Sequence, residues 1–238
     1  MADLRRFFVD SVSDTTVIEG DEFRHAVQVL RIREQEEIIL CNNSGTEYLA
    51  KVIAINKKDL IASVFDKRES DKEPKSKLML IAGYLKGDKT ELIVQKATEL
   101  GVNEIVVFSS QFSSAYINDN KLERLNKVAV EASKQCGRAI VPKVTYAENF
   151  TKALECGKSF NNKLFACEFA KKGDVDFRSL SGDTAIVVGS EGGFSKEEYE
   201  TALSQGYKTV YLGKRILRAE TACIALCAII MQSLGELS

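Results

Sequence analysis

The second part of the chain alternates short apolar runs with helix-like segments, and this alternation restricts the fold more than any other feature. The runs are mostly aliphatic, as expected for strands that are covered on both faces. They occupy residues 78–84, 104–108, 163–167, 184–188 and 209–212. The segments between them carry helix end signals: glycine follows 89–100 and 121–136, and Ser195 with Glu198 forms a capping box at the start of 195–205. The pattern predicts an α/β domain with a mainly parallel sheet.

The first part of the chain is typical of antiparallel strands instead. Apolar runs at 37–41, 48–55 and 60–65 are joined by the short turns NNSG and NKKD, and a helix-like segment at 21–30 precedes them. The segment 66–77 has almost no apolar residues and is interpreted as the connection between two domains. We therefore expect a small β-barrel or sandwich over 1–70, a linker over 71–77 and the α/β domain over 78–238.

Composition excludes several classes of protein. The 33 basic and 34 acidic residues nearly cancel, so any affinity for nucleic acid must come from a local patch. Six cysteines without a C-x-x-C pair and a single histidine predict no metal site and argue against a Ser-His-Asp triad. The amino-terminal residues do not resemble a secretory signal, and the apolar run 222–231 is too short to cross a bilayer, so we expect a cytoplasmic protein without a membrane span.

Two loops at predicted strand ends are candidates for a ligand site. GSEGGF at 189–194 places three glycines directly after a buried strand, where open α/β sheets bind ligands, although a tight strand-to-helix turn is the alternative. LGKRILRAETA at 212–222 follows the next strand, and its Leu212, Gly213, Ile216 and Leu217 offer backbone groups and an apolar wall. Arg218 and Glu220 add charge in the same loop. For these two residues, a surface ion pair or a favourable charge at a helix amino terminus is the alternative reading.

The motifs together resemble a known family. GSEGGFS, LGKRILRAETA, KATELGVNEI and EASKQCGRAIVP, with RRFFV and RHAVQVLRI near the amino terminus, are similar to the SPOUT superfamily and, within it, to bacterial 16S ribosomal RNA (uracil-N3) methyltransferases. The resemblance implies a PUA-like β-barrel, an α/β domain with a trefoil knot, a homodimer and S-adenosylmethionine as methyl donor. The chain departs from the family in two places: Ser190 stands where proline is usual, and IREQEEIIL lacks the glycine that commonly precedes the strand.

The resemblance also implies roles for individual residues. Arg218 would stabilise negative charge on the uracil oxygens, and Glu220 would act as base or orient the arginine. The cofactor would lie against three loops, in contact with Glu168, Gly189, Ser190, Glu191, Gly192, Gly193, Leu212, Gly213, Ile216, Leu217 and Ala222. The partner would be 16S ribosomal RNA or the small ribosomal subunit.

Candidate RNA contacts come from local charge. Residues 121–143 hold six cations against two carboxylates, and arginines gather near the amino terminus. The candidates are Arg5, Arg6, Arg24, Arg31 and Arg138, with an ordinary solvated surface as the alternative. Two other functions remain open: a SPOUT enzyme acting on a different RNA nucleotide, and a non-catalytic RNA-binding factor in ribosome assembly. The last helix, predicted at 221–234, is apolar on nearly all sides, which favours a dimer.

Overall fold

The computed structural model describes residues 4–111, 117–167 and 174–237. The chain forms two compact units, which are treated separately below. Unit 1 comprises Met1–Glu73 together with Ser133–Val141, and unit 2 comprises Pro74–Ala132 and Pro142–Ser238. Within the described residues, no helix has the length and apolar character needed to cross a membrane.

Unit 1 is built on a five-stranded sheet with the order β1-β3-β4-β5-β2. Neighbouring strands are antiparallel except for the parallel pair β1 and β3. The strands are β1 (Arg5–Phe8), β2 (Thr15–Glu19), β3 (Glu37–Cys41), β4 (Thr46–Ile55) and β5 (Asp59–Glu69), with helix α1 (Gly20–Arg24) continuing into a π-helical turn, His25–Val29. One face packs a core that includes Phe7, Ile18, Ile38, Leu40 and Leu60. The predicted strands and helix are confirmed, whereas β1 and β2 were not predicted because each buries only one or two apolar side chains.

The interpretation of 66–77 as a connection without regular structure is wrong at its start. Residues 66–69 belong to β5 and pair with 46–49 of β4. Their side chains are all exposed, so the segment lacks the apolar pattern by which strands are found, while its backbone still completes the ladder. A second local feature lies before β3, where Gln35 adopts a φ of 72°, a left-handed conformation that favours glycine. Gln35 therefore adopts a left-handed conformation without being glycine, and β3 begins two residues later.

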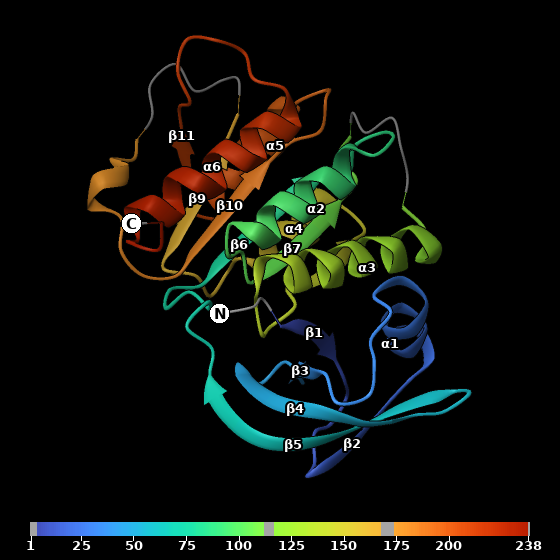
Figure 1. The fold of residues 1–238 in the computed structure, drawn as a ribbon. Coiled ribbons are helices and arrows are strands. Elements are labelled where there is room, and N and C mark those ends of the chain that lie inside the picture. Colours follow the sequence, from blue (N-terminus) through green and yellow to red (C-terminus); the bar gives the residue numbers. More distant parts are fainter. Residues whose placement is uncertain (1–3, 112–116, 168–173, 238) are drawn as a thin grey trace. The chain divides into compact units, whose positions relative to one another are not determined.

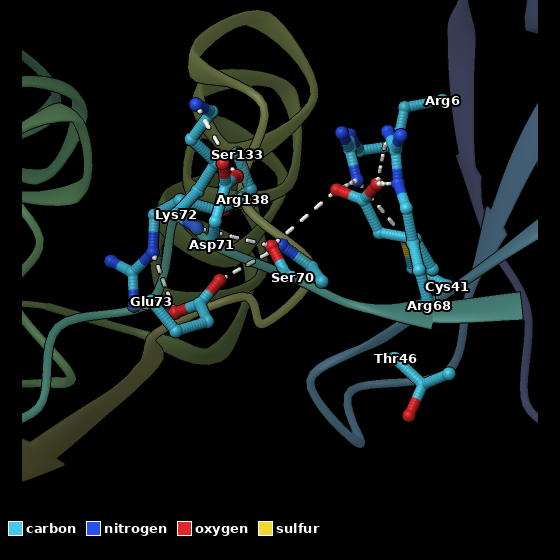
Figure 2. Close-up of polar contacts among 12 residues, drawn as sticks. Arg6, Cys41, Thr46, Arg68, Ser70, Asp71, Lys72, Glu73, Ser133 and Arg138 are labelled. Atoms are coloured by element: carbon cyan, nitrogen blue, oxygen red, sulfur yellow. Dashed lines mark hydrogen bonds and ion pairs between the residues drawn. The ribbon is translucent and has the colours of Figure 1, made fainter.

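Two carboxylates, one buried and one partly buried, organise the polar contacts of unit 1 (Figure 2). Glu47, only 3% exposed, accepts hydrogen bonds from Arg6 Nη1 and Arg68 Nε, each at 2.9 Å. Glu73 accepts from Arg138 Nη2 at 2.9 Å and from the backbone N–H groups of Ala139 at 2.8 Å and Ile140 at 3.0 Å. Glu73 thereby attaches the segment 133–141 to unit 1, although this segment lies much later in the sequence.

Unit 2 contains a six-stranded sheet in which every neighbouring pair is parallel, in the order β11-β9-β10-β6-β7-β8. This confirms the predicted parallel sheet. The strands are β6 (Leu78–Gly83), β7 (Glu104–Phe108), β8 (Lys143–Ala147), β9 (Asn162–Ala166), β10 (Thr184–Val188) and β11 (Lys208–Val210). The helices are α2 (Lys89–Glu99), α3 (Asp119–Cys136), α4 (Phe150–Cys156), α5 (Lys196–Ser204) and α6 (Ala219–Ser233), with a 3-10 turn at Phe177–Ser179. Strand β8 and helix α4 were not predicted, since both are short and carry several polar residues.

Helices cover both faces of this sheet (Figure 1). Helices α2 and α6 pack together, and α6 also contacts β6 and β10. On the other face, α4 and α5 close a core rich in phenylalanine, in which the ring centroids of Phe165 and Phe194 are 4.5 Å apart. The capping box predicted for α5 is present, with Ser195 and Glu198 each bonding to the backbone N–H of the other. Because all six strands are parallel, their carboxyl ends lie at one edge of the sheet.

The buried Glu47 gives unit 1 a predicted dependence on pH. Burial raises the pKa of Glu47, but hydrogen bonds and charge from Arg68 and Arg6 outweigh it and hold the pKa below its ordinary value of 4.5. Ionised Glu47 therefore stabilises the fold above that pH, and the contribution is lost as the pH falls through the lower folded-state value. We expect Glu47→Gln to reduce the free energy of unfolding at pH 7 by about 3 kcal/mol, because it leaves two arginines without their charge partner.

Urea unfolding at pH 7 and pH 4 measures this effect. The variant should also lose less stability than the wild type between the two pH values. Glu69→Gln, at an exposed carboxylate on the same β5 strand, is the matched control and should behave as wild type at pH 7. Equal stability of Glu47→Gln and wild type at pH 7 would contradict the assignment.

Candidate functional site

The carboxyl ends of β9, β10 and β11 and the start of α6 line one cavity of about 760 Å³ in unit 2. Ligands of open parallel sheets bind in this position, beyond the strand ends. Of the residues predicted to hold a cofactor, ten line this cavity: Gly189, Ser190, Glu191, Gly192, Gly193, Leu212, Gly213, Ile216, Leu217 and Ala222. The eleventh, Glu168, lies outside the described residues. The structure thus brings the two predicted loops together, and their contact with a cofactor stays a prediction.

The glycine-rich loop is a tight turn packed against the sheet. The N–H of Gly193 donates to the carbonyl of Ser190 at 3.0 Å, and Gly193 has a φ of 68°. A Cβ atom on Gly189 would lie 2.8 Å from the ring of Phe194. Gly83, the last residue of β6, approaches even more closely, since its Cβ would lie 2.4 Å from the backbone nitrogen of Ser190. Only glycine at these positions permits this path of the loop.

Ser190 is one of the two positions at which the sequence analysis found a departure from the family pattern, in this case from proline. Its side chain is buried, and its hydroxyl lies 3.0 Å from the hydroxyl of Ser110, which follows β7. The two hydroxyl groups satisfy each other in a position where a buried polar group without a partner would be costly. A hydrogen bond therefore holds the turn here, in place of the ring constraint of proline.

Lys89 is a cavity residue that the sequence analysis missed. It stands at the start of α2, and its Nζ lies 2.9 Å from Oε1 of Glu191 in the glycine-rich loop. Partial burial raises the pKa of Glu191, but the hydrogen bonds from Lys89 and from backbone N–H groups of Glu191 and Lys86 outweigh it and lower the pKa. The hydrogen bond to Glu191 raises the pKa of Lys89 in turn. The sequence signal that could have indicated Lys89 was the position of KGDK directly after a buried strand. Its partner Glu191 is 102 residues away, so the contact itself has no local pattern.

The second loop brings charge to the same cavity. Arg218 is exposed and precedes α6 as its N-cap residue, while Glu220 lies in the first helical turn, where the dipole favours a carboxylate. Oε2 of Glu220 is buried and has no hydrogen-bond partner among the described residues. Ile216 is completely exposed, so the loop presents apolar as well as charged groups. The two predicted catalytic residues therefore line the cavity together.

The predicted RNA contacts in unit 1 fall into two groups. The side chains of Arg6 and Arg138 are 8% and 3% exposed, and each is paired with a carboxylate, Glu47 and Glu73 respectively. This burial commits their donors to the fold and removes both from the candidates for phosphate contact. Arg5, Arg24 and Arg31 are exposed, with Arg24 paired to the nearby Asp21.

Metal chemistry finds no support in the described parts of the chain. Across residues 4–111, 117–167 and 174–237, no group of three or more histidine, cysteine, aspartate or glutamate side chains could hold a metal ion. The six cysteines are free thiols, and burial raises the pKa of Cys227 to about 12, so this thiol stays protonated at neutral pH.

Comparison with known proteins assigns the class. A family model for the RNA methyltransferase domain matches residues 71–231, and a model for the RNA methyltransferase PUA domain matches residues 18–65. The ribosomal RNA small subunit methyltransferase E of Mesomycoplasma hyopneumoniae (strain 232) is 33% identical over 224 residues, which cover 93% of this chain and 96% of that protein. The Bacillus subtilis (strain 168) protein of the same name is 32% identical, with 97% of each chain covered.

A solved structure agrees with these sequence matches. The ribosomal RNA small subunit methyltransferase E from Neisseria gonorrhoeae, bound to S-adenosyl methionine, superimposes with a TM-score of 0.87 at 29% identity, covering 96% of this chain and 97% of that one. The fold and the cavity thus define an RNA methyltransferase with an amino-terminal PUA domain. Within that class, the chain belongs to the ribosomal RNA small subunit methyltransferase E family. The resemblance to 16S ribosomal RNA methyltransferases and the expected α/β methyltransferase domain after a PUA-like domain are confirmed.

Proposed function

We propose that this enzyme transfers the methyl group of S-adenosylmethionine to N3 of a uridine in 16S ribosomal RNA of the small ribosomal subunit. The observation that carries the proposal is the single cavity lined by the glycine-rich loop and by Arg218 and Glu220. Membership of the family supplies the reaction class and the cofactor. The cavity supplies groups with which this chain would carry the reaction out.

The residues present fit S-adenosylmethionine. The cavity of about 760 Å³ is large enough for a nucleoside cofactor, and Leu212, Leu217 and Ala222 give it an apolar wall. Gly192 and Gly193 expose backbone groups that can hydrogen-bond the adenine and ribose. When bound, the cofactor supplies a methyl group on a positively charged sulfur. The protein's task is to bind and orient both reactants and to manage the proton of the nucleophile.

The nucleophile is a ring nitrogen that carries a proton at neutral pH. We assign proton acceptance to Oε2 of Glu220, which is buried in the cavity wall and accepts no hydrogen bond from the described residues. Arg218, exposed beside it, stabilises the negative charge that develops on the uracil oxygens. The alternative is that Glu220 only orients Arg218, and the two roles differ in their dependence on pH.

The remaining parts of the proposal concern RNA, assembly and location. Arg5, Arg24 and Arg31 of unit 1 would contact RNA phosphates, because they are exposed and cationic. A homodimer is supported by α6, a largely apolar helix on which the apolar side chain of Ile229 is 37% exposed. We also propose that the loops lining the cavity form the trefoil knot of SPOUT enzymes. Residues 71–77 would divide the RNA-binding domain from the methyltransferase domain. The protein would act in the cytoplasm, where ribosomal RNA is modified.

Mass spectrometry of ribosomal RNA tests the proposed reaction. Deletion of the gene should remove one methyl group from a single uridine of 16S RNA, and complementation should restore it. A methyl group lost from another nucleotide or another RNA would identify a different target of the same enzyme. No lost methyl group at all would favour a non-catalytic role in ribosome assembly.

Substitution of the two charged residues should separate chemistry from cofactor binding. We expect Arg218→Ala to lower kcat by about 100-fold, the usual effect of removing one stabiliser of developing charge, with little change in the affinity for S-adenosylmethionine. Glu220→Gln should lower kcat similarly, and kcat should then rise with pH as hydroxide replaces the lost base. Single-turnover methylation and isothermal titration measure the two quantities.

Lys208→Ala, at an exposed residue of β11 outside the cavity, is the control and should keep full turnover. If Arg218→Ala retained wild-type kcat, the electrostatic role would be wrong. A Glu220→Gln variant whose slow rate does not change with pH would assign Glu220 to orienting the arginine.

Substitution of Gly83 by alanine should displace the glycine-rich loop and so weaken the proposed cofactor site. The Cβ of Gly83→Ala would overlap the backbone at Gly189 and Ser190, so the glycine-rich loop must move. We expect the affinity for S-adenosylmethionine to fall at least tenfold. Gly157→Ala is the matched control. Its Cβ would clash with the hydroxyl of Tyr207, which belongs to the phenylalanine-rich core and does not line the cavity.

The control should lower the melting temperature without a specific loss of cofactor affinity. Isothermal titration together with thermal unfolding distinguishes the two variants. Unchanged affinity in a folded Gly83→Ala protein would show that the loop does not bind the cofactor as proposed.

A further inference from the structure

A second cavity lies beside the connection between β6 and α2. It has a volume of about 310 Å³ and belongs wholly to unit 2. Residues from the connection, from the start of α2 and from the first turns of α3 line it: Tyr84, Lys86, Gly87, Asp88, Thr90, Glu91, Lys121, Arg124 and Leu125. The sequence analysis counted Lys121 and Arg124 among the six cations of residues 121–143, and the proposed mechanism assigns no role to any of the lining residues.

Cations converge on this cavity from two elements. Lys86 comes from the connection and is exposed, while Lys121 and Arg124 come from α3. The Nζ of Lys121 lies 5.4 Å from the centroid of the Tyr84 ring, which holds this ammonium group over an aromatic face. Three cations thus face two carboxylates, Asp88 and Glu91, in one small hollow.

The pairing of Arg124 leaves part of its guanidinium available. Glu91 is occupied by Arg124, whose Nε and Nη2 lie 2.8 and 2.9 Å from its two oxygens. This bidentate pairing fixes the plane of the guanidinium, and three of its five N–H groups point away from the two bonded to Glu91. Asp88 is farther from Arg124, at 3.7 Å, and its side chain is almost fully exposed. The guanidinium of Arg124 is therefore held in a fixed orientation with N–H donors still available.

The connection itself is rigid. The hydroxyl of the buried Thr90 accepts a hydrogen bond from the backbone N–H of Leu85 at 2.9 Å, and Leu85 is also completely buried. Gly87 has a φ of 65°, which turns the chain between Lys86 and Lys89. Lys86 lines the second cavity and Lys89 lines the first, so the three-residue step between them spans at most about 11 Å. The two cavities are thus lined by residues of one short chain segment.

We propose that the second cavity binds a backbone phosphate of the RNA substrate, next to the target nucleotide, through Lys86, Lys121 and Arg124. The proposal rests on the proposed function, because it assigns a subsite for the same substrate. A phosphate fits the cavity by charge, by the oriented guanidinium of Arg124 and by the short chain segment that lines both cavities. The subsite positions the strand and does not take part in the chemistry.

Kinetics with unmodified small ribosomal subunits, prepared from a strain lacking the gene, test the subsite. We expect Lys86→Ala and Lys121→Gln each to raise KM for the subunits about tenfold, as for the loss of one charge-assisted hydrogen bond. Each variant should reduce the slope of log affinity against log salt by about 0.7. Turnover at saturating RNA and the affinity for S-adenosylmethionine should match the wild type.

Two further variants sharpen the experiment. Asp88→Asn removes a carboxylate that competes with a phosphate for Arg124, so it should lower KM and leave the fold intact, since Asp88 makes no side-chain cap for α2. Lys127→Ala lies on the same helix α3 but outside the cavity, is 62% exposed, and should leave KM and the salt slope unchanged.

Each outcome has a separate meaning. Unchanged KM and salt slope in Lys86→Ala and Lys121→Gln would overturn the subsite. So would an equal effect of Lys127→Ala, which would indicate general surface charge, or a loss of affinity for S-adenosylmethionine, which would indicate a cofactor contact. Failure of the proposed function would appear instead in the wild type, as an absence of methyl transfer to the unmodified subunits.

Discussion

The cavity proposed to hold the cofactor depends on the close approach of two backbones at the edge of the parallel sheet. Gly83 ends β6 so near to Gly189 and Ser190 that no side chain fits between them. The ion pair between Lys89 and Glu191 adds a second attachment from the start of α2. The site is therefore built on rigid elements, as orientation of two reactants requires.

This arrangement also explains how a charged segment can stand between an apolar strand and an apolar helix. Residues 213–218 do not enter the core but run along the open side of the cavity, where Arg218 is exposed to solvent. Glu220 is partly buried at the start of α6, where the dipole of the helix favours its charge. The desolvation cost is small for the arginine and partly offset for the glutamate. Sequence adjacency to buried elements thus does not imply burial of the charges.

Apolar runs predicted the parallel sheet well because both faces of its strands are covered. The bounds of β7 and β10 agree with the predicted runs 104–108 and 184–188. The same reasoning missed β1, β2, β8 and α4, whose few buried side chains leave no periodic pattern. The glycine-rich loop was found from its composition, whereas the contact of Lys89 with Glu191 joins residues 102 positions apart and has no local signal. Local chemistry predicts loops, and only the fold shows which distant residues meet.

The same limit governs arginine in an RNA-binding protein. Arg6 and Arg138 were predicted to contact phosphates, yet each forms the buried half of an ion pair with Glu47 or Glu73. Removing one partner of such a pair destabilises the fold far more than the intact pair stabilises it. Both arginines therefore serve folding rather than contact with RNA. With a net charge of −1, the chain offers no general attraction to RNA. Affinity must then come from small groups of exposed or preorganised cations, and a cavity that gathers three of them concentrates the charge that the surface as a whole lacks.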